Sequence, residues 1–187
     1  MEKIKLYDKV FRPYIPYEEF ICDIEKTCQK LNQDYKDCGM GQQEDIPIIL
    51  CVLNGAIPFT AEVLRRLDFP CELSSLKLSS YEGTCSTGEV KFSQPLTCSV
   101  KNRRILIIED IVDTGCTIQA LRKHLQTLGA KDIRICTLFY KEEAFRFKEE
   151  FQIDYYARSI QNQFIVGFGL DYNELGRNYK DIYILDE

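Results

Sequence analysis

The chain has 187 residues, of which 45% are apolar and 28% charged, and its formal net charge is −5. A globular domain of this length buries roughly 70% of the surface that its unfolded chain exposes, so it needs no disulfide or metal to hold a core. The single histidine, His124, excludes zinc sites and mechanisms that require two imidazoles. The acidic balance argues against a general nucleic-acid binder, which normally carries a basic face.

The cysteines number nine, an odd count, and show no C-x-x-C pair or other zinc-ligand spacing. This pattern is typical of free thiols in a reducing compartment. The first ten residues lack an apolar signal core, and the longest apolar stretch, Ile48 to Leu53, is too short to span a membrane. We therefore expect a cytoplasmic protein without a membrane partner.

The first half of the chain alternates helical and strand patterns. Apolar residues at spacings of three and four predict a helix from Glu18 to about Tyr35. The continuous apolar run from Ile46 to Leu53 predicts a strand buried on both faces, and it ends in the turn signal Asn54-Gly55. A helix over about 58–67 follows.

The middle of the chain continues this alternation around one long loop. A strand is predicted over 73–78, and residues 80–100 gather Gly, Pro, Ser and Thr. Loops longer than about 15 residues are usually functional or disordered. A buried strand then follows Arg104, a helix runs over about 116–128, and Asp132 to Tyr140 is the next strand.

The last part is predicted as a charged helical stretch over 145–150 and shorter apolar runs over 155–157, 164–168 and 182–185, which we expect to complete the sheet. Alternating strands and helices predict one α/β domain, a parallel twisted sheet flanked by helices. In such sheets the ligand lies outside the carboxyl ends of the strands, so the residues that follow each strand are the ones to examine.

The most informative segment is ILIIEDIVDTGCT, Ile105 to Thr117, in which an apolar strand delivers two adjacent acids. Glu109 and Asp110 would repel and desolvate each other unless a cation or hydroxyl groups share their site. A divalent metal or a polyol is the natural partner for them. Because successive side chains of a strand point to opposite faces, the two carboxylates flank the strand end.

The same segment then prepares an anion site. Asp113, Thr114, Gly115, Cys116 and Thr117 lead into a helix, whose first backbone amides lack partners within the helix and attract negative charge. Carboxylates beside an anion cradle fit a ligand that carries both hydroxyls and a phosphate. The alternative is an ordinary strand-to-helix turn with a capping Asp or Thr, and the absence of G-K-[ST] excludes a P-loop.

This segment resembles the phosphoribosyl-diphosphate signature of the type I phosphoribosyltransferases. Lys141 at a strand end, the string QNQFIVGFGLDYNE and Arg177 make the chain similar to the hypoxanthine-guanine members of that family. The resemblance covers about Ile46 to the C-terminus, and the first forty or so residues add nothing to it. It implies a single phosphoribosyltransferase domain over 1–187, with a small hood built from the N-terminal segment and about 155–187, and a flexible active-site loop over about 80–100.

The resemblance also implies a reaction in purine salvage. A phosphoribosyl group passes from 5-phosphoribosyl 1-diphosphate to hypoxanthine, and to guanine as well, giving IMP or GMP and diphosphate, with Mg²⁺ as cofactor. The family forms homodimers or homotetramers, so we expect one of these. A guanine- or xanthine-preferring relative, an RNA-binding regulator on the same fold and a signalling receiver domain are the alternatives.

By match to the family motif, Glu109 and Asp110 hold the ribose hydroxyls and reach magnesium, and Asp113 moves the proton of the purine as general base. Asn54 and Gly55 point amides at the diphosphate, which Arg177 also binds. The remaining nucleotide-binding positions form the loop between the acids and the helix: Ile111, Val112, Thr114, Gly115, Cys116 and Thr117.

The purine side is implied in the same way. Lys141 donates to the six-oxo group, Phe164 stacks on the base, and the backbone around Gln163 and Ile165 reads its edge. Asp171 lies at the base and contacts a second magnesium. Two lid residues, Ser80 and Tyr81, close over the site. Relatives often carry Lys at three positions where this chain departs from the pattern: Asn54, Cys116 and Gln163.

Overall fold

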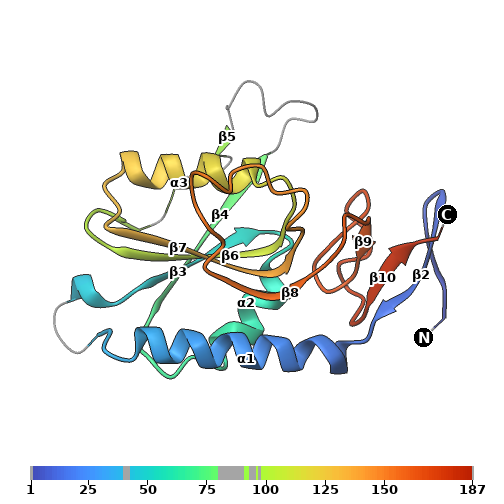
Figure 1. The fold of residues 1–187 in the computed structure, drawn as a ribbon, viewed down its shortest axis with the longest axis horizontal. Helices are drawn as coiled ribbons and strands as arrows, with labels where there is room; N and C mark the ends of the chain where they lie inside the picture. Colours follow the sequence, from blue (N-terminus) through green and yellow to red (C-terminus); the bar gives the residue numbers. More distant parts are fainter. Residues whose placement is uncertain (1, 40–42, 80–90, 93–95, 97, 187) are drawn as a thin grey trace.

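A computed structural model describes residues 2–39, 43–79, 91–92, 96 and 98–186. They form a central sheet with helices on both faces and a second, smaller sheet at one end (Figure 1). Five strands of the central sheet are parallel, in the order β4-β3-β6-β7-β8, and β5 pairs antiparallel with the end of β4. The parallel α/β sheet predicted from the sequence is confirmed.

The strands of the central sheet match the predicted runs closely. They are β3 (Ile48–Leu53), β4 (Glu72–Ser79), β5 (Lys91–Phe92), β6 (Arg104–Val112), β7 (Asp132–Tyr140) and β8 (Tyr155–Ser159). Strand β5 lies within the segment predicted as a long loop, where Leu78 pairs with Phe92. Ser80, Tyr81 and the rest of 80–90, the predicted lid, lie outside the described residues.

Helices cover the two faces of the central sheet and explain its apolar strands. Helices α1 (Tyr17–Tyr35) and α2 (Ile57–Leu64) lie on one face, and α3 (Cys116–Thr127) lies on the other (Figure 1). Along β3, Ile49 and Cys51 pack with α1 and α2, whereas Ile48 and Leu50 pack with α3. Because side chains alternate between the faces of a strand, two covered faces require an unbroken apolar run.

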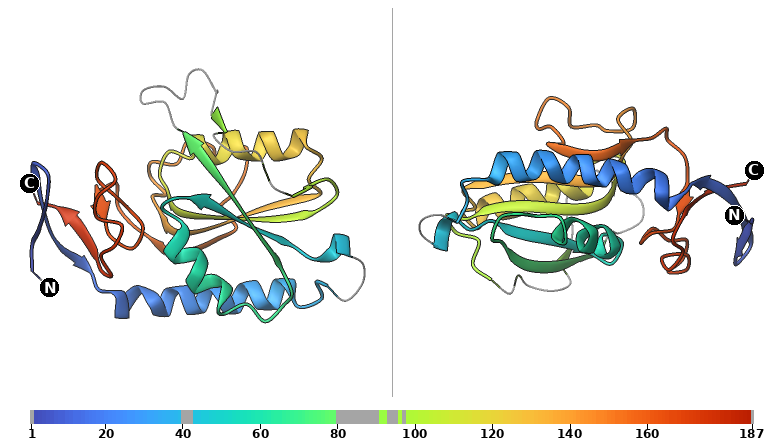
Figure 2. Two further views of the ribbon diagram at one scale, coloured as in Figure 1. Left: turned by 180° about the vertical axis from the view of Figure 1, so that it is seen from behind. Right: turned by 90° about the horizontal axis from the view of Figure 1, so that it is seen from below.

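The second sheet, here called the hood sheet, joins the two ends of the chain. Its antiparallel order is β1-β2-β10-β9, with β1 (Ile4–Leu6), β2 (Lys9–Ile15), β9 (Ile165–Val166) and β10 (Ile182–Leu185). Figure 2 shows that it projects from the end of the central sheet, beyond the first turn of α1. The prediction that the last two apolar runs complete the central sheet is therefore wrong.

Two further expectations need correction. Residues 145–150 form no helix: 145–147 are irregular and 148–150 are a turn. The Arg146 amide donates to the Thr114 carbonyl, which ties this segment to the loop after β6. Of the described cysteines, seven carry free thiols as expected, whereas Cys116 is disulfide-bonded. Disulfide pairing depends on distances in the folded chain, so spacing along the sequence did not reveal it.

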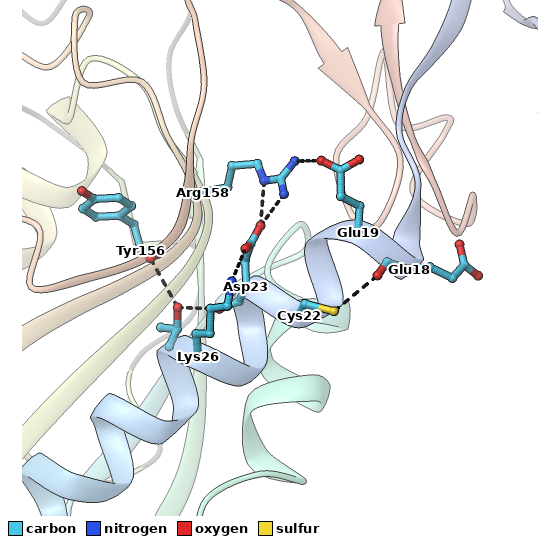
Figure 3. Close-up of polar contacts among 8 residues, drawn as sticks. Glu18, Glu19, Cys22, Asp23, Lys26, Tyr156 and Arg158 are labelled. Carbon is cyan, nitrogen blue, oxygen red and sulfur yellow. Dashed lines mark hydrogen bonds and ion pairs between the residues drawn. The ribbon is translucent and has the colours of Figure 1, made fainter.

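Polar contacts fix the start of α1 against the sheet edge, next to the hood. Figure 3 shows Arg158 of β8 binding Asp23 through Nε at 2.7 Å and also reaching Glu19. The Thr27 hydroxyl donates to the Tyr156 carbonyl at 3.3 Å. These contacts hold the junction between β2 and α1, and with it the hood, in a defined position. No helix in the described part of the chain is long and apolar enough to cross a membrane.

Candidate active site

The carboxyl ends of β3 and β6 meet a loop of the hood at a pocket of about 260 Å³. It brings together seven residues that the sequence nominated from four separate stretches: Asn54, Gly55, Glu109, Asp110, Thr117, Asp171 and Arg177. The position agrees with the rule that ligands of parallel sheets lie beyond the strand ends. Four distant stretches of sequence thus share one site.

The turn after β3 is shaped for close backbone approach. The peptide bond between Leu53 and Asn54 is cis. A Cβ atom on Gly55 would lie 1.6 Å from Oδ2 of Asp110, and one on Gly169 would lie 2.0 Å from the Gly55 carbonyl oxygen. Only glycine leaves room for these contacts, because it has no Cβ. The two glycines therefore bring the turn and the hood loop against the acids.

The two acids at the end of β6 are removed from water. Burial and the neighbouring Asp110 raise the pKa of Glu109 well above its usual range, and Oε2 of Glu109 is buried without a partner among the described residues. Burial also raises the pKa of Asp110 to about 6, although the Ile111 amide and Arg177 oppose this shift. An unpaired buried carboxylate oxygen is costly, so the site favours a ligand that supplies a cation or a donor.

These raised pKa values predict a stability that depends on pH. A carboxyl group whose pKa is raised by folding stabilises the folded state most below pH 4, and this contribution is lost as the pH rises through about 6. Asp110→Asn removes the titration. Its free energy of unfolding relative to wild type should rise by on the order of 2 to 3 kcal/mol between pH 4 and pH 7, measured by urea unfolding. A difference that is constant across this range would contradict the burial of the carboxylate.

Arg177 comes to the same pocket from the hood. Its Nη2 lies 2.7 Å from Oδ1 of Asp171, its Nη1 donates to the Gly169 carbonyl at 2.8 Å, and its Nε is buried without a partner in the described part of the chain. The Arg177 side chain thus lines the pocket, and Asp171, Glu174 and the Gly169 carbonyl orient its guanidinium. A planar guanidinium suits the oxygens of a diphosphate.

A second, smaller pocket lies along the loop between β6 and α3, the phosphate loop (residues 111–116). It is lined by the loop from Ile111 to Cys116 together with Glu109, Thr117 and Ile118, so Glu109 and Thr117 line both pockets. Gly115 precedes α3 with φ of 83°, and a Cβ there would lie 2.4 Å from the Phe145 ring. The sequence predicted this cradle at the start of a helix, and the structure places the helix at Cys116.

Asp113 and Lys141 lie side by side. Nζ of Lys141 donates to Oδ2 of Asp113 at 2.6 Å, and it also donates to Oδ1 of Asn162 at 3.2 Å. The Lys141 side chain is 8% exposed and that of Asp113 is 44% exposed, so the carboxylate faces the open side. The sequence assigned these two residues to different atoms of one base and did not predict that they contact each other.

The hood carries the aromatic side of the site. Phe164 is 45% exposed and contacts Phe11 and Tyr172, with ring centroids 6.1 and 5.9 Å away. Lys9 lies over the same ring at 5.6 Å. Phe11 and Lys9 belong to the N-terminal segment. The sequence assigned this segment to the hood but gave none of its residues a part in the site, because a ring contact between positions so far apart leaves no local pattern.

Gln163 and Ile165 flank this ring. Gln163 and Phe164 line a third pocket with Asn162 and the end of β10, and Oε1 of Gln163 is buried without a partner among the described residues. Ile165 is buried in β9, which is an edge strand of the hood sheet. Within the described ranges, one side of that strand has no strand partner and can present backbone groups to a ligand.

Comparisons with known proteins identify the family of this chain. A family model for the phosphoribosyl transferase domain matches residues 17–173. The hypoxanthine-guanine phosphoribosyltransferase of Streptococcus pyogenes is 39% identical over 170 residues, which are 90% of this chain and 89% of that protein. Its counterpart in Streptococcus pneumoniae is 34% identical over 97% of both chains.

Solved structures share the fold. A variant of the hypoxanthine phosphoribosyltransferase of Trypanosoma cruzi, complexed with its product IMP, superposes with a TM-score of 0.85 at 30% identity, covering 98% of this chain and 94% of that one. The fold is thus shared along nearly the full length. The chain belongs to the phosphoribosyl transferase domain family, and within it to the hypoxanthine-guanine phosphoribosyltransferases.

Proposed function

We propose that the pockets at the carboxyl ends of β3 and β6 form the active site in which the phosphoribosyl group of 5-phosphoribosyl 1-diphosphate is transferred to hypoxanthine or guanine. One observation carries this proposal: Glu109 and Thr117 line both the pocket that contains Arg177 and the pocket of the phosphate loop. The two pockets are therefore adjacent, and one ligand with a phosphate at each end and hydroxyls between them fits such a pair.

The two phosphate groups are held at opposite ends. The 5-phosphate lies on the amides at the start of α3 and on the hydroxyls of Thr114 and Thr117, where the helix dipole favours an anion. The diphosphate lies against the turn at Asn54 and Gly55 and against Arg177. Cys116 and Asn54 carry no positive charge, whereas relatives often have a lysine at these positions. Phosphate binding in this chain therefore depends more on backbone amides.

A magnesium ion would supply the positive charge that the buried carboxylates of this pocket lack. Glu109 and Asp110 are buried carboxylates, and Oε2 of Glu109 has no partner among the described residues. Asp171 lines the same pocket. Mg²⁺ prefers carboxylate oxygens together with substrate phosphates and water. Held by these carboxylates, Mg²⁺ would neutralise charge on the diphosphate leaving group, while Glu109 and Asp110 would orient the ribose hydroxyls.

The purine lies between Phe164 and the Asp113–Lys141 pair. Phe164 offers a partly exposed ring for stacking. Lys141 donates to the six-oxo group, and the free side of β9 at Ile165 reads the edge of the base with backbone groups. Adenine carries an amino group at the same position. This group is itself a hydrogen-bond donor, so it cannot accept a hydrogen bond from the ammonium of Lys141.

The chemical step breaks the bond between the anomeric carbon and the diphosphate oxygen. The purine nitrogen bonds to that carbon from the opposite face, and the proton of its imidazole ring passes to the Asp113 carboxylate. Developing positive charge on the ribose is stabilised by the buried acids of β6. In the reverse direction Asp113 returns the proton to the base.

A base panel tests this proposal. The protein, 5-phosphoribosyl 1-diphosphate and Mg²⁺ are incubated with hypoxanthine, guanine, xanthine or adenine, and nucleotide formation is followed. We expect turnover with hypoxanthine and guanine, at least 100-fold lower kcat/KM with adenine, and loss of activity with excess EDTA that Mg²⁺ restores. Turnover with none of the bases would refute the enzyme proposal, and preference for xanthine would favour the alternative relative.

Two further features belong to the same proposal. A cytoplasmic location is favoured by the substrates. A homodimer or homotetramer is expected from the family and is checked by a native mass measurement.

A further inference from the structure

The ammonium of Lys141 is shared by residues from separate segments. Lys141 follows β7, Asp113 follows β6, and Asn162 lies in the segment that leads from β8 into the hood. Nζ donates to the Asp113 carboxylate at 2.6 Å and to the Asn162 amide oxygen at 3.2 Å. The Lys141 side chain is only 8% exposed, so its charge depends on partners within the protein.

The two hydrogen bonds of Lys141 fix the orientation of its ammonium group. A lysine ammonium has three N–H donors and no acceptor. Asp113 and Asn162 take two of them, in two different directions from Nζ. With only one fixed partner, the remaining N–H groups would rotate freely about that contact. With two, the direction of the third N–H is determined by the protein before any ligand arrives.

Asn162 also places this third donor relative to the stacking ring. It lines the pocket that Phe164 lines, two residues along the same segment. Backbone hydrogen bonds tie this segment down on either side, since the Leu185 amide donates to the Phe164 carbonyl at 3.0 Å and the Gln163 amide donates to the Gln161 carbonyl at 2.8 Å. The ring that stacks on a base and the amide that orients Lys141 therefore lie two residues apart on one segment that is bonded to β10.

We propose that Asn162 is a positioning residue that aims the third N–H of Lys141 at the six-position of the bound base and so sets the preference for a six-oxo over a six-amino purine. The proposal rests on the proposed function, because it assumes that a purine binds against Phe164. It adds a residue that accepts a hydrogen bond from Lys141 and acts through it.

Two isosteric variants separate this role from simple packing. Asn162→Leu keeps the size of the side chain but removes the acceptor, whereas Asn162→Asp keeps an acceptor oxygen at the same position. Gln161→Ala is the matched control, because the neighbouring Gln161 side chain is exposed and has no hydrogen-bond partner in the described part of the chain, where its backbone carbonyl accepts from the Gln163 amide. KM for hypoxanthine, KM for 5-phosphoribosyl 1-diphosphate, kcat and the hypoxanthine-to-adenine ratio of kcat/KM are measured for each.

We expect Asn162→Leu to raise KM for hypoxanthine about tenfold and to lower the hypoxanthine-to-adenine ratio by a similar factor, as fits the loss of one charge-assisted hydrogen bond. KM for 5-phosphoribosyl 1-diphosphate should change less than twofold. Asn162→Asp should restore most of the affinity for hypoxanthine, and Gln161→Ala should resemble wild type.

The outcomes distinguish this inference from the proposed function. An active wild type with an unchanged hypoxanthine KM in Asn162→Leu overturns the inference alone, as does equal impairment of the Leu and Asp variants. A wild type that turns over none of the bases overturns the proposed function and the inference with it. Thermal unfolding of each variant identifies one that fails to fold. If Asn162→Leu fails to fold, Asn162→Ala replaces it, because it also removes the acceptor and the same results are expected from it.

Discussion

Replacing Asp113 by Asn is expected to lower kcat by about 100- to 10,000-fold, the usual contribution of a general base. In the wild type, Lys141 donates to Asp113 at 2.6 Å. The Asn side chain of the variant keeps an oxygen that can accept this hydrogen bond, but it cannot take up the proton of the purine. KM for 5-phosphoribosyl 1-diphosphate should stay within about threefold of wild type, because the phosphates are held by other groups. Steady-state kinetics with both substrates measures the two effects separately.

The same replacement leaves the charge of Lys141 without its anionic partner. Since the Lys141 side chain is 8% exposed, a lower melting temperature is expected in addition, and folding of the variant must be verified by circular dichroism. Asp132→Asn is the matched control, because that carboxylate forms a surface ion pair with Arg134 at 3.4 Å, away from the pockets. Equal losses in kcat and in phosphoribosyl diphosphate binding would assign Asp113 a binding role.

The second large effect is expected at Gly55. A methyl group there would lie 1.6 Å from Oδ2 of Asp110, so either the turn after β3 or the carboxylate must move. Displacement of a positioning group by about 1 Å costs on the order of 100-fold in rate. Gly55→Ala should therefore lower kcat/KM for 5-phosphoribosyl 1-diphosphate by about 100-fold or more, while a direct binding measurement shows a smaller change for the base.

Gly129→Ala is the control for the loss of a glycine as such. Gly129 has φ of 81°, and a Cβ there would meet nothing closer than the Lys101 side chain at 3.4 Å. It should lower the free energy of unfolding by about 1 kcal/mol and leave the kinetic constants unchanged. If Gly55→Ala behaved in the same way, the close approach to Asp110 would have no catalytic importance.

The central sheet could be predicted because its pattern is local. Strand β7 begins and ends at the predicted residues, Asp132 and Tyr140, and α1 begins one residue before the predicted start. Strands covered on both faces are continuously apolar, and helices covered on one face repeat every three or four residues, so each segment carries its own pattern.

The hood sheet could not be predicted in the same way. Strand β9 has two residues and β1 has three, too few to show a period. The pairing of Leu185 with Phe11 joins the two ends of the chain, which no window along the sequence contains. The N-terminal segment, which showed no functional pattern, supports the Phe164 ring through Phe11 and Lys9.

What the sequence by itself determined is the segment from Glu109 to Thr117, because a strand end, two acids and a phosphate loop follow one another without a gap and need only local geometry to form a site. The tertiary structure alone decided that Arg177 and Asp171 share a pocket with these acids, and that Asn162 and Asp113 meet at one lysine nitrogen. The physical reason is that Asp171 and Arg177 come from a hood loop in which Gly169 lies against the Gly55 carbonyl, and contacts between such distant segments leave no pattern within either one.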